Sequence, residues 1–377
     1  MVLAARAYVA KSTISDLENA RKEPTPDTAK AVDRALSAGG ELTGMVTAGA
    51  AGPTPPAHQL WEASELLARV RASDVSAATV EALHLTAYDL CRDYSWRDAA
   101  ELRADGLHWL REVERLLRRP VGLRQHKELL TVAGWLALLV GCVEYDLGMR
   151  PTAESTRVAA LRLAEEGGNG EIAAWAWEMS AWFALTQGRY PDVLAAVESG
   201  RARVGEHTAV VQLLGQEAKA RGRMGDLPGV RYALERGRQL LDRFPRPVHP
   251  EHHFVVDPDK WDFYAMDAYR LAGDDEPAQH HAEEVLRLGT ASNGTERAPM
   301  RMAEARLTLG AVAARAGELE QAVDVGLTAF HATRRSLPSL LMVAREVAAE
   351  LRRRDPPGRP WNEFREAVRS VAAGSAE

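Results

Sequence analysis

Residues 170–200, GEIAAWAWEMSAWFALTQGRYPDVLAAVESG, hold two helical segments separated by a single glycine, Gly188. Ala181 lies seven residues before this glycine, Val193 five residues after it and Gly200 twelve residues after it. Small side chains at such positions let two helix axes approach to about 8–10 Å, because large side chains on both helices would hold them apart. The stretch therefore predicts a closely packed helical hairpin.

The same pattern recurs along much of the chain. Five glycines align, at spacings of 40, 37, 48 and 44 residues: Gly148, Gly188, Gly225, Gly273 and Gly317. Mostly small residues stand at the same three offsets from them: Gly141, Ala181, Ala218, Met266 and Gly310, then Ala153, Val193, Val230, Ala278 and Ala322, then Ala160, Gly200, Gly237, Val285 and Ala329. Periods of this size are typical of two-helix repeats. Because Ala, Leu, Arg and Glu dominate and β-branched runs are scarce, we expect an all-α fold.

These repeats, over roughly residues 126–335, resemble tetratricopeptide (TPR) repeats in register, and we expect residues 337–371 to form a capping helix pair. The resemblance implies an α-superhelix in which the first helix of each repeat lines a concave wall. Candidate ligand-binding side chains on that wall are Trp135, Tyr145, Trp175, Glu178, Trp182, Lys219, Lys260, Phe263, Asp267 and Arg270. Such a wall suits an extended peptide or an amphipathic small molecule. The alternative is that the tryptophans only fill the core between repeats.

A compact piece precedes the repeats, bounded by Pro24, Pro26, Gly39-Gly40 and a Gly- and Pro-rich run at residues 49–56. Short helices are expected in it at residues 3–9, 11–20 and 27–36. Residues 3–24, LAARAYVAKSTISDLENARKEP, resemble the middle of the phage-repressor-like (XRE) helix-turn-helix of actinobacterial transcriptional regulators.

The XRE resemblance makes residues 11–20 the recognition helix. It implies that Lys11, Ser12, Ser15 and Asp16 face base edges in the major groove. It also implies that four residues lie near phosphates, where they fix register: Thr13, Asn19, Arg21 and Lys22. Because one recognition helix reads too little sequence, a homodimer bound to operator DNA is implied.

Only two residues precede Leu3, where the family has a further helix. We therefore expect a truncated module, or a start codon assigned downstream of the natural one. Ala10 stands where the family usually has a hydroxyl cap, and Ala20 where it usually has glycine. Residues 1–42 carry six basic and six acidic side chains, so no strong general attraction to DNA is expected. The alternative interpretation is a degenerate hairpin that caps the repeat array.

A non-helical insertion at residues 249–261 accounts for the largest repeat spacing. Long ordered loops of this kind often carry binding function. We expect this one to cover the groove, anchored by Phe254 and Val255, and we expect Asp257-Pro258-Asp259 to cap the next helix. The alternative is a metal site, and with it a metal-dependent enzyme, built from the histidines and carboxylates of His249–Asp259 together with His280 and His281. No HExxH-like signature occurs, so we predict no metal.

Whole-chain properties exclude further classes of protein. Cys91 and Cys142 lack paired spacing and are interpreted as small core residues, which fits the cytoplasm. The most apolar stretch, Leu129–Val143, is shorter than a bilayer span and precedes Glu144 and Asp146, so no membrane insertion is expected. The net charge of −6 argues against general nucleic-acid binding by the whole chain. No phosphate-binding loop, nucleophile elbow or dinucleotide fingerprint occurs, so we predict no enzyme and no cofactor.

The sequence therefore predicts four parts: a truncated XRE-type helix-turn-helix at 1–42, a linker at 43–56, a helical connecting segment at 57–125 and a TPR-like domain at 126–377. The leading hypothesis is a cytoplasmic, dimeric transcriptional regulator that responds to a small molecule or peptide in the groove of its TPR-like domain. The rival hypothesis is a TPR-like adaptor that binds partner proteins without binding DNA.

Overall fold

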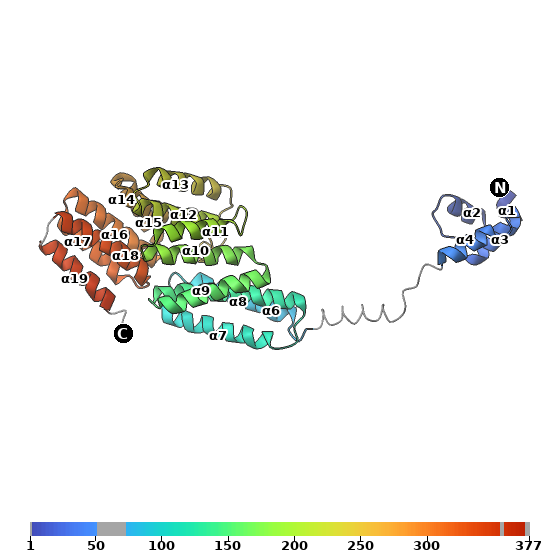
Figure 1. Cartoon of the computed structure of the whole chain (residues 1–377), viewed down its shortest axis with the longest axis horizontal. Coiled ribbons are helices and arrows are strands. Elements are labelled where there is room, and N and C mark those ends of the chain that lie inside the picture. Colours follow the sequence, from blue (N-terminus) through green and yellow to red (C-terminus); the bar gives the residue numbers. More distant parts are fainter. Residues whose placement is uncertain (1, 51–72, 355–357, 374–377) are drawn as a thin grey trace. The chain divides into compact units, whose positions relative to one another are not determined.

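The computed structural model describes residues 2–50, 73–354 and 358–373 (Figure 1). The chain forms two compact units, residues 1–71 and 72–377, which are described separately. Within the described residues every element is a helix, apart from one isolated bridge between Thr290 and Glu296. The all-α prediction is therefore confirmed. The helix expected near residues 57–71 and the linker residues 51–56 lie outside the described part of the chain.

The first unit contains the helices α1 (Val2–Arg6), α2 (Lys11–Glu18), α3 (Pro26–Leu36) and α4 (Glu41–Ala50). Its core is small, because the buried apolar side chains are mainly alanines: Ala4, Ala7, Ile14, Ala29 and Ala35. The three helices expected here are present, with ends shifted by a few residues. A left-handed backbone at Ala20, with a φ of 52°, follows α2 and explains why glycine is the usual residue at this position.

Helix α4 occupies the first part of the predicted linker. The Asp33 carboxylate of α3 accepts hydrogen bonds from the Thr43 hydroxyl (2.6 Å), the Thr43 amide (2.8 Å) and the Leu42 amide (3.4 Å). The pKa of Asp33 is lowered by these bonds, and the Thr43 hydroxyl contributes most. Because these bonds satisfy free amides at the start of α4, they tie this helix to α3. Residues 43–50 are therefore helical and form part of the first unit.

The second unit is a succession of helices that pair with their neighbours in the chain (Figure 1). The helices are α6 (Ala77–Asp93), α7 (Ala99–Leu117), α8 (Leu123–Asp146), α9 (Arg150–Gly167), α10 (Gly170–Thr186), α11 (Tyr190–Arg201), α12 (Thr208–Arg223), α13 (Leu227–Leu241), α14 (Pro258–Ala272), α15 (Asp275–Gly289), α16 (Pro299–Ala316), α17 (Leu319–Thr328), the 3-10 turn η1 (Ala329–His331), α18 (Leu337–Arg354) and α19 (Arg359–Ala373). α6 and α7 share one hydrophobic core with α8–α10, so the predicted connecting segment contributes to the array itself.

The repeat register is visible in the backbone. All five aligned glycines adopt positive φ angles, between 74° and 89°, at the end of the first helix of a pair: Gly148, Gly188, Gly225, Gly273 and Gly317. Glycine adopts this left-handed conformation without the steric cost that a Cβ atom brings. The glycines therefore end each first helix, and the predicted period matches the helix pairs of the structure.

The small residues lie where the helices of a pair touch. A Cβ atom on Gly310 would lie 3.0 Å from the backbone oxygen of Ala322, its partner at the next offset. Residues at the third offset face the following pair, since a Cβ atom on Gly237 would lie 2.1 Å from the Trp261 ring. The contact within a pair is therefore as predicted for the first two offsets, whereas the third offset, expected to serve the same pair, packs against the first helix of the next one.

Helix α18 joins the two ends of the array. It packs against α16 and also reaches α8 and α10 near the start of the second unit. Ser339 of α18 accepts a hydrogen bond from the Trp182 indole nitrogen (2.9 Å). Just before α18, the buried Arg334 guanidinium pairs with the buried Asp146 carboxylate of α8 at 2.7 Å. The helix expected to begin a terminal cap therefore returns to the first repeats.

Helix α8 is the one described helix that is long and apolar enough to cross a membrane by length and composition. However, 78% of its apolar window is buried against other helices. The two acidic residues at its C-terminal end, Glu144 and Asp146, are buried and paired with Arg103 and Arg334. α8 is thus a core helix of the array.

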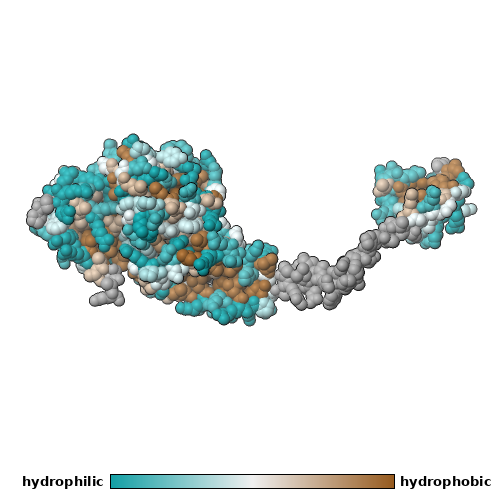
Figure 2. Space-filling view, viewed as in Figure 1, coloured by the Kyte–Doolittle hydropathy of each residue, from teal (hydrophilic) through white to brown (hydrophobic). Residues whose placement is uncertain are grey.

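The exposed face of the second unit in Figure 2 is mainly hydrophilic, with apolar surface around the end formed by α6, α7 and α8. Large apolar side chains exposed on these helices or between them are Leu85, Trp96 and Leu123. Most of the hydrophobic content of the chain is therefore inside the array.

Candidate functional site

The first candidate site is helix α2. Lys11, Ser12 and Ser15 are exposed on it, while Ile14 is buried and fixes the helix to the rest of the unit. Asp16 is half-buried. The N-terminal turn of α2 thus presents short polar side chains and one cation to solvent, which is the geometry that a recognition helix needs.

The predicted phosphate contacts lie around the end of α2. The Asn19 amide nitrogen donates to the Ser15 carbonyl (2.7 Å), which closes the helix, and Arg21 and Lys22 are exposed just after it. Thr13 is half-buried. Ala10 provides no side-chain cap for α2, as the sequence indicated. The structure brings the eight predicted residues together on one short helix and the turn that follows it.

The second candidate site is a cavity of about 370 Å³ inside the array, which we call the central cavity. Its walls come from α10, α12, α14 and α16, from the loop before α14, and from α18. Five of the ten predicted ligand-binding residues line it: Glu178, Trp182, Lys219, Lys260 and Phe263. Rings and charged groups thus line the same cavity, as is common in small-molecule sites.

A hydrogen-bonded acid lies on the α10 wall of the central cavity. Glu178 is 5% exposed and accepts hydrogen bonds from the side-chain amides of Gln212 (3.1 Å) and Gln216 (2.7 Å). Burial raises its pKa. The side-chain oxygen of Gln216 is buried and has no hydrogen-bond partner within the described part of the chain. Leaving a buried acceptor unpaired is costly, so this oxygen would gain most from a ligand that carries an N–H or O–H group.

A cation and a second acid lie across the cavity. The Lys219 ammonium is 4.0 Å from the centre of the Phe263 ring, within the range of a cation–π interaction, and 3.8 Å from the Glu304 carboxylate. Burial raises the pKa of Glu304 to about 7, and the nearby Lys219 only partly opposes this. The charge of the cavity therefore changes near neutral pH.

Lys260 has a structural role as well as a position on the cavity wall. Its ammonium donates to the backbone carbonyls of His252, His253 and Val255. Burial lowers its pKa to about 7. The Asp257 side chain accepts from the Lys260 amide (2.9 Å), which confirms the predicted cap of α14. Lys260 thus holds the preceding loop against the array.

Three of the predicted wall aromatics lie in the core and not around the central cavity. The rings of Trp135 and Trp175 are each 5.4 Å from that of Phe254, which anchors the loop from residue 249 to 257. Tyr145 stacks on Phe183 (3.8 Å) and is fully buried. The loop covers this end of the wall, and its Phe254 side chain packs against the Trp135 and Trp175 rings. The core alternative therefore describes these three residues.

Asp267 and Arg270 also lie away from the cavity. The Asp267 carboxylate pairs with Arg223 (2.7 Å) and with Arg270, and both arginines pair with Glu346 of α18. Asp267, Arg223 and Arg270 are buried. These charges are neutralised within the protein, and they attach α18 to α12 and α14.

The histidines of the loop do not form a metal site. The His252 ring stacks on the Tyr88 ring, with 4.5 Å between the ring centres. The ring centre of His253 lies 3.6 Å from that of Tyr94. Burial lowers the pKa of His252 to about 4 and that of His253 well below its usual value. His281 pairs instead with Asp262. No group of three or more potential ligands is arranged for a metal among the described residues, so the metal-enzyme alternative is not supported. Phe254 and Val256 are the buried anchors of the loop, whereas Val255 is only half-buried.

Several residues of the central cavity were missed by the sequence interpretation. Ser339 and Met342 come from α18, and Gln216, Tyr264 and Arg301 stand at offsets that the repeat pattern did not assign to the wall. The repeat register predicts a superhelix whose concave side is open. It gives no information on a later helix that packs against that side.

Comparison of the sequence with known protein families gives a match in the first unit. The helix-turn-helix family model matches residues 2–37, which cover α1, α2 and α3. The match supports a DNA-binding transcription regulator with an XRE-type helix-turn-helix at its N-terminal end. No curated relative matches the chain.

Proposed function

We propose that the chain is a ligand-responsive transcriptional regulator, in which a TPR-like array senses a small molecule or peptide and two copies of the helix-turn-helix unit read an operator. The single observation that supports this most is a cavity, lined by rings and buried polar groups, on the same chain as an XRE-type helix-turn-helix. A ligand that contacts α18 and the wall helices together favours one arrangement of them, and such differential contact is what regulation requires. A cytoplasmic location fits this role.

The DNA-binding part of the proposal predicts that substitutions in α2 weaken specific binding to DNA. Replacing Lys11 and Ser12 with alanine is expected to weaken specific binding at least about tenfold, because each good base contact contributes about 1–3 kcal/mol. A shift assay over fragments of the source genome measures this. Lys127→Ala, which removes the same charge from an exposed site in the array, is the control and should bind as wild type.

The regulator and the adaptor predict different outcomes of that assay. A regulator binds some fragments specifically and loses them in the α2 variant. Absence of specific binding, both by this chain and by one extended upstream of residue 1, would remove the transcriptional proposal and leave the adaptor.

The sensor part predicts a ligand that co-purifies with the protein. Met342→Trp fills part of the central cavity from α18, and it is expected to reduce the bound ligand at least about tenfold, since the added ring removes space that the ligand needs. Mass spectrometry of small molecules and peptides released by denaturing the purified full chain measures the effect. Leu85→Trp, at an exposed site on α6, is the matched control. Equal release from both variants would contradict the assignment of the cavity.

A further inference from the structure

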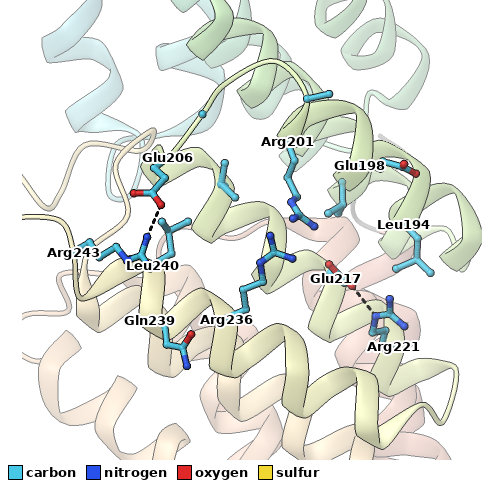
Figure 3. Close-up of a pocket in the computed structure, with 14 residues that line it drawn as sticks. Leu194, Glu198, Arg201, Glu206, Glu217, Arg221, Arg236, Gln239, Leu240 and Arg243 are labelled. Carbon is cyan, nitrogen blue, oxygen red and sulfur yellow. Dashed lines mark hydrogen bonds and ion pairs between the residues drawn. The ribbon is translucent and has the colours of Figure 1, made fainter.

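A second hollow lies on the other side of helix α12. It is an open cleft of about 900 Å³ between α11 and α13, with α12 as its floor, and we call it the arginine cleft (Figure 3). Gln212, Gln216 and Lys219 of α12 face the central cavity, whereas Glu217 and Arg221 face the cleft. At 100° per residue these two sets lie on opposite sides of the helix. The cleft is therefore separate from the proposed ligand site.

Four arginines line the cleft, and two of them are neutralised. Arg221 pairs with Glu217 (2.8 Å) and Asp226 (2.6 Å), and Arg243 pairs with Glu206 (Figure 3). These pairs hold the floor and one rim of the cleft in place.

The other two arginines, Arg201 of α11 and Arg236 of α13, have no carboxylate within 4.0 Å among the described residues. Arg236 donates to the Tyr232 hydroxyl (3.2 Å). Figure 3 shows both guanidinium groups pointing into the middle of the cleft, toward one another. Two like charges that converge in a hollow repel each other, and an anion between them would relieve this.

We propose that the arginine cleft binds an acidic peptide segment of a partner protein, with carboxylates of the segment placed between Arg201 and Arg236. The guanidinium group offers paired N–H donors that match a carboxylate. Leu194, Val197 and Leu240 also line the cleft and would receive aliphatic side chains of the same segment.

The lining favours a peptide over nucleic acid. Glu198 also lines the cleft beside the paired glutamates, so Arg201 and Arg236 suit a few separate carboxylates better than a continuous run of phosphates. The cleft lining contains no aromatic ring among the described residues, whereas single-stranded nucleic acid is usually bound by stacking its bases on such rings.

The test uses the full chain and a fluorescent synthetic peptide of alternating glutamate and leucine. Wild type is expected to bind it in a salt-dependent manner, and the double variant Arg201→Gln/Arg236→Gln to bind at least about tenfold more weakly, because hydrogen bonds to charged groups are the stronger ones. Arg231→Gln, an exposed position of α13 outside the cleft, should leave binding unchanged. Circular dichroism checks that the variants are folded.

Three outcomes would overturn the proposal. The first is equal binding by wild type and the double variant, and the second is no binding of the peptide at any concentration reached. The third is tighter binding of an oligothymidylate than of the peptide, lost in the same double variant, which would make the cleft a nucleic-acid site. A matched peptide with glutamine in place of glutamate should not bind. None of these results depends on operator binding or on the central cavity, so the two proposals fail separately.

Discussion

Asp267→Ala is expected to destabilise the second unit by about 3–5 kcal/mol, because it leaves the buried Arg223 and Arg270 without the carboxylate between them. Glu346 remains as their partner but is itself partly exposed. Thermal and urea unfolding of the full chain measure the loss. Asp242→Ala, which breaks the exposed pair with Arg238, is the matched control and should cost about 0–1 kcal/mol.

The same residue predicts a dependence on pH. Burial alone would raise the pKa of Asp267, but Arg223, Lys219 and Arg270 hold it below its ordinary value of 3.8. A lowered pKa adds stability that is present above the unfolded-state pKa and is lost as pH falls below it. Wild type should therefore lose stability more steeply than Asp267→Ala below about pH 4. Parallel acid-unfolding curves for the two proteins would contradict this.

Glu304→Gln is expected to stabilise the protein by up to about 3 kcal/mol at pH 8. Burial raises the pKa of Glu304 to about 7 from an ordinary 4.5, so the favourable contribution of its protonated form is present at low pH and lost as pH rises through 7. Glutamine has nearly the shape of the protonated acid and stays neutral. The gain should shrink strongly at pH 5.

Urea unfolding midpoints at pH 5 and pH 8 measure this difference. Glu320→Gln, at an exposed site on α17, removes the same charge and should show no comparable gain. A Glu304→Gln variant that is less stable than wild type at pH 8 would mean that its contact with Lys219 outweighs the cost of burial.

The repeat architecture was predictable because it depends on local features. Glycine recurs where a first helix ends, as at Gly188, and small residues recur where two helices touch, as at Ala181. Both can be recognised in the sequence because their positions in the repeat are fixed. Helix α2 was predictable for the same reason, since Lys11 to Asn19 form a continuous segment with one buried position at Ile14.

The central cavity was only half predictable. The TPR-like register predicted Glu178, Trp182 and Lys219 on its wall, because the direction of each of these side chains follows from its own helix. It also placed Trp175 there, although the long loop that carries Phe254 covers that ring. Contacts between a loop or a terminal helix and a distant wall depend on the whole fold, and no short-range pattern encodes them.

The bond between Arg334 and Asp146 joins residues 188 positions apart. In a stack of helical repeats, each repeat contacts only its neighbours. Such a stack can extend, because each interface between repeats can open independently. Here the buried Arg334, just before α18, pairs with the buried Asp146 of α8, so the array could extend only after this charge pair is broken. The segment from Arg334 into α18 therefore ties late helices of the second unit to α8. Because α18 also borders the central cavity, we expect its position to respond to a bound ligand.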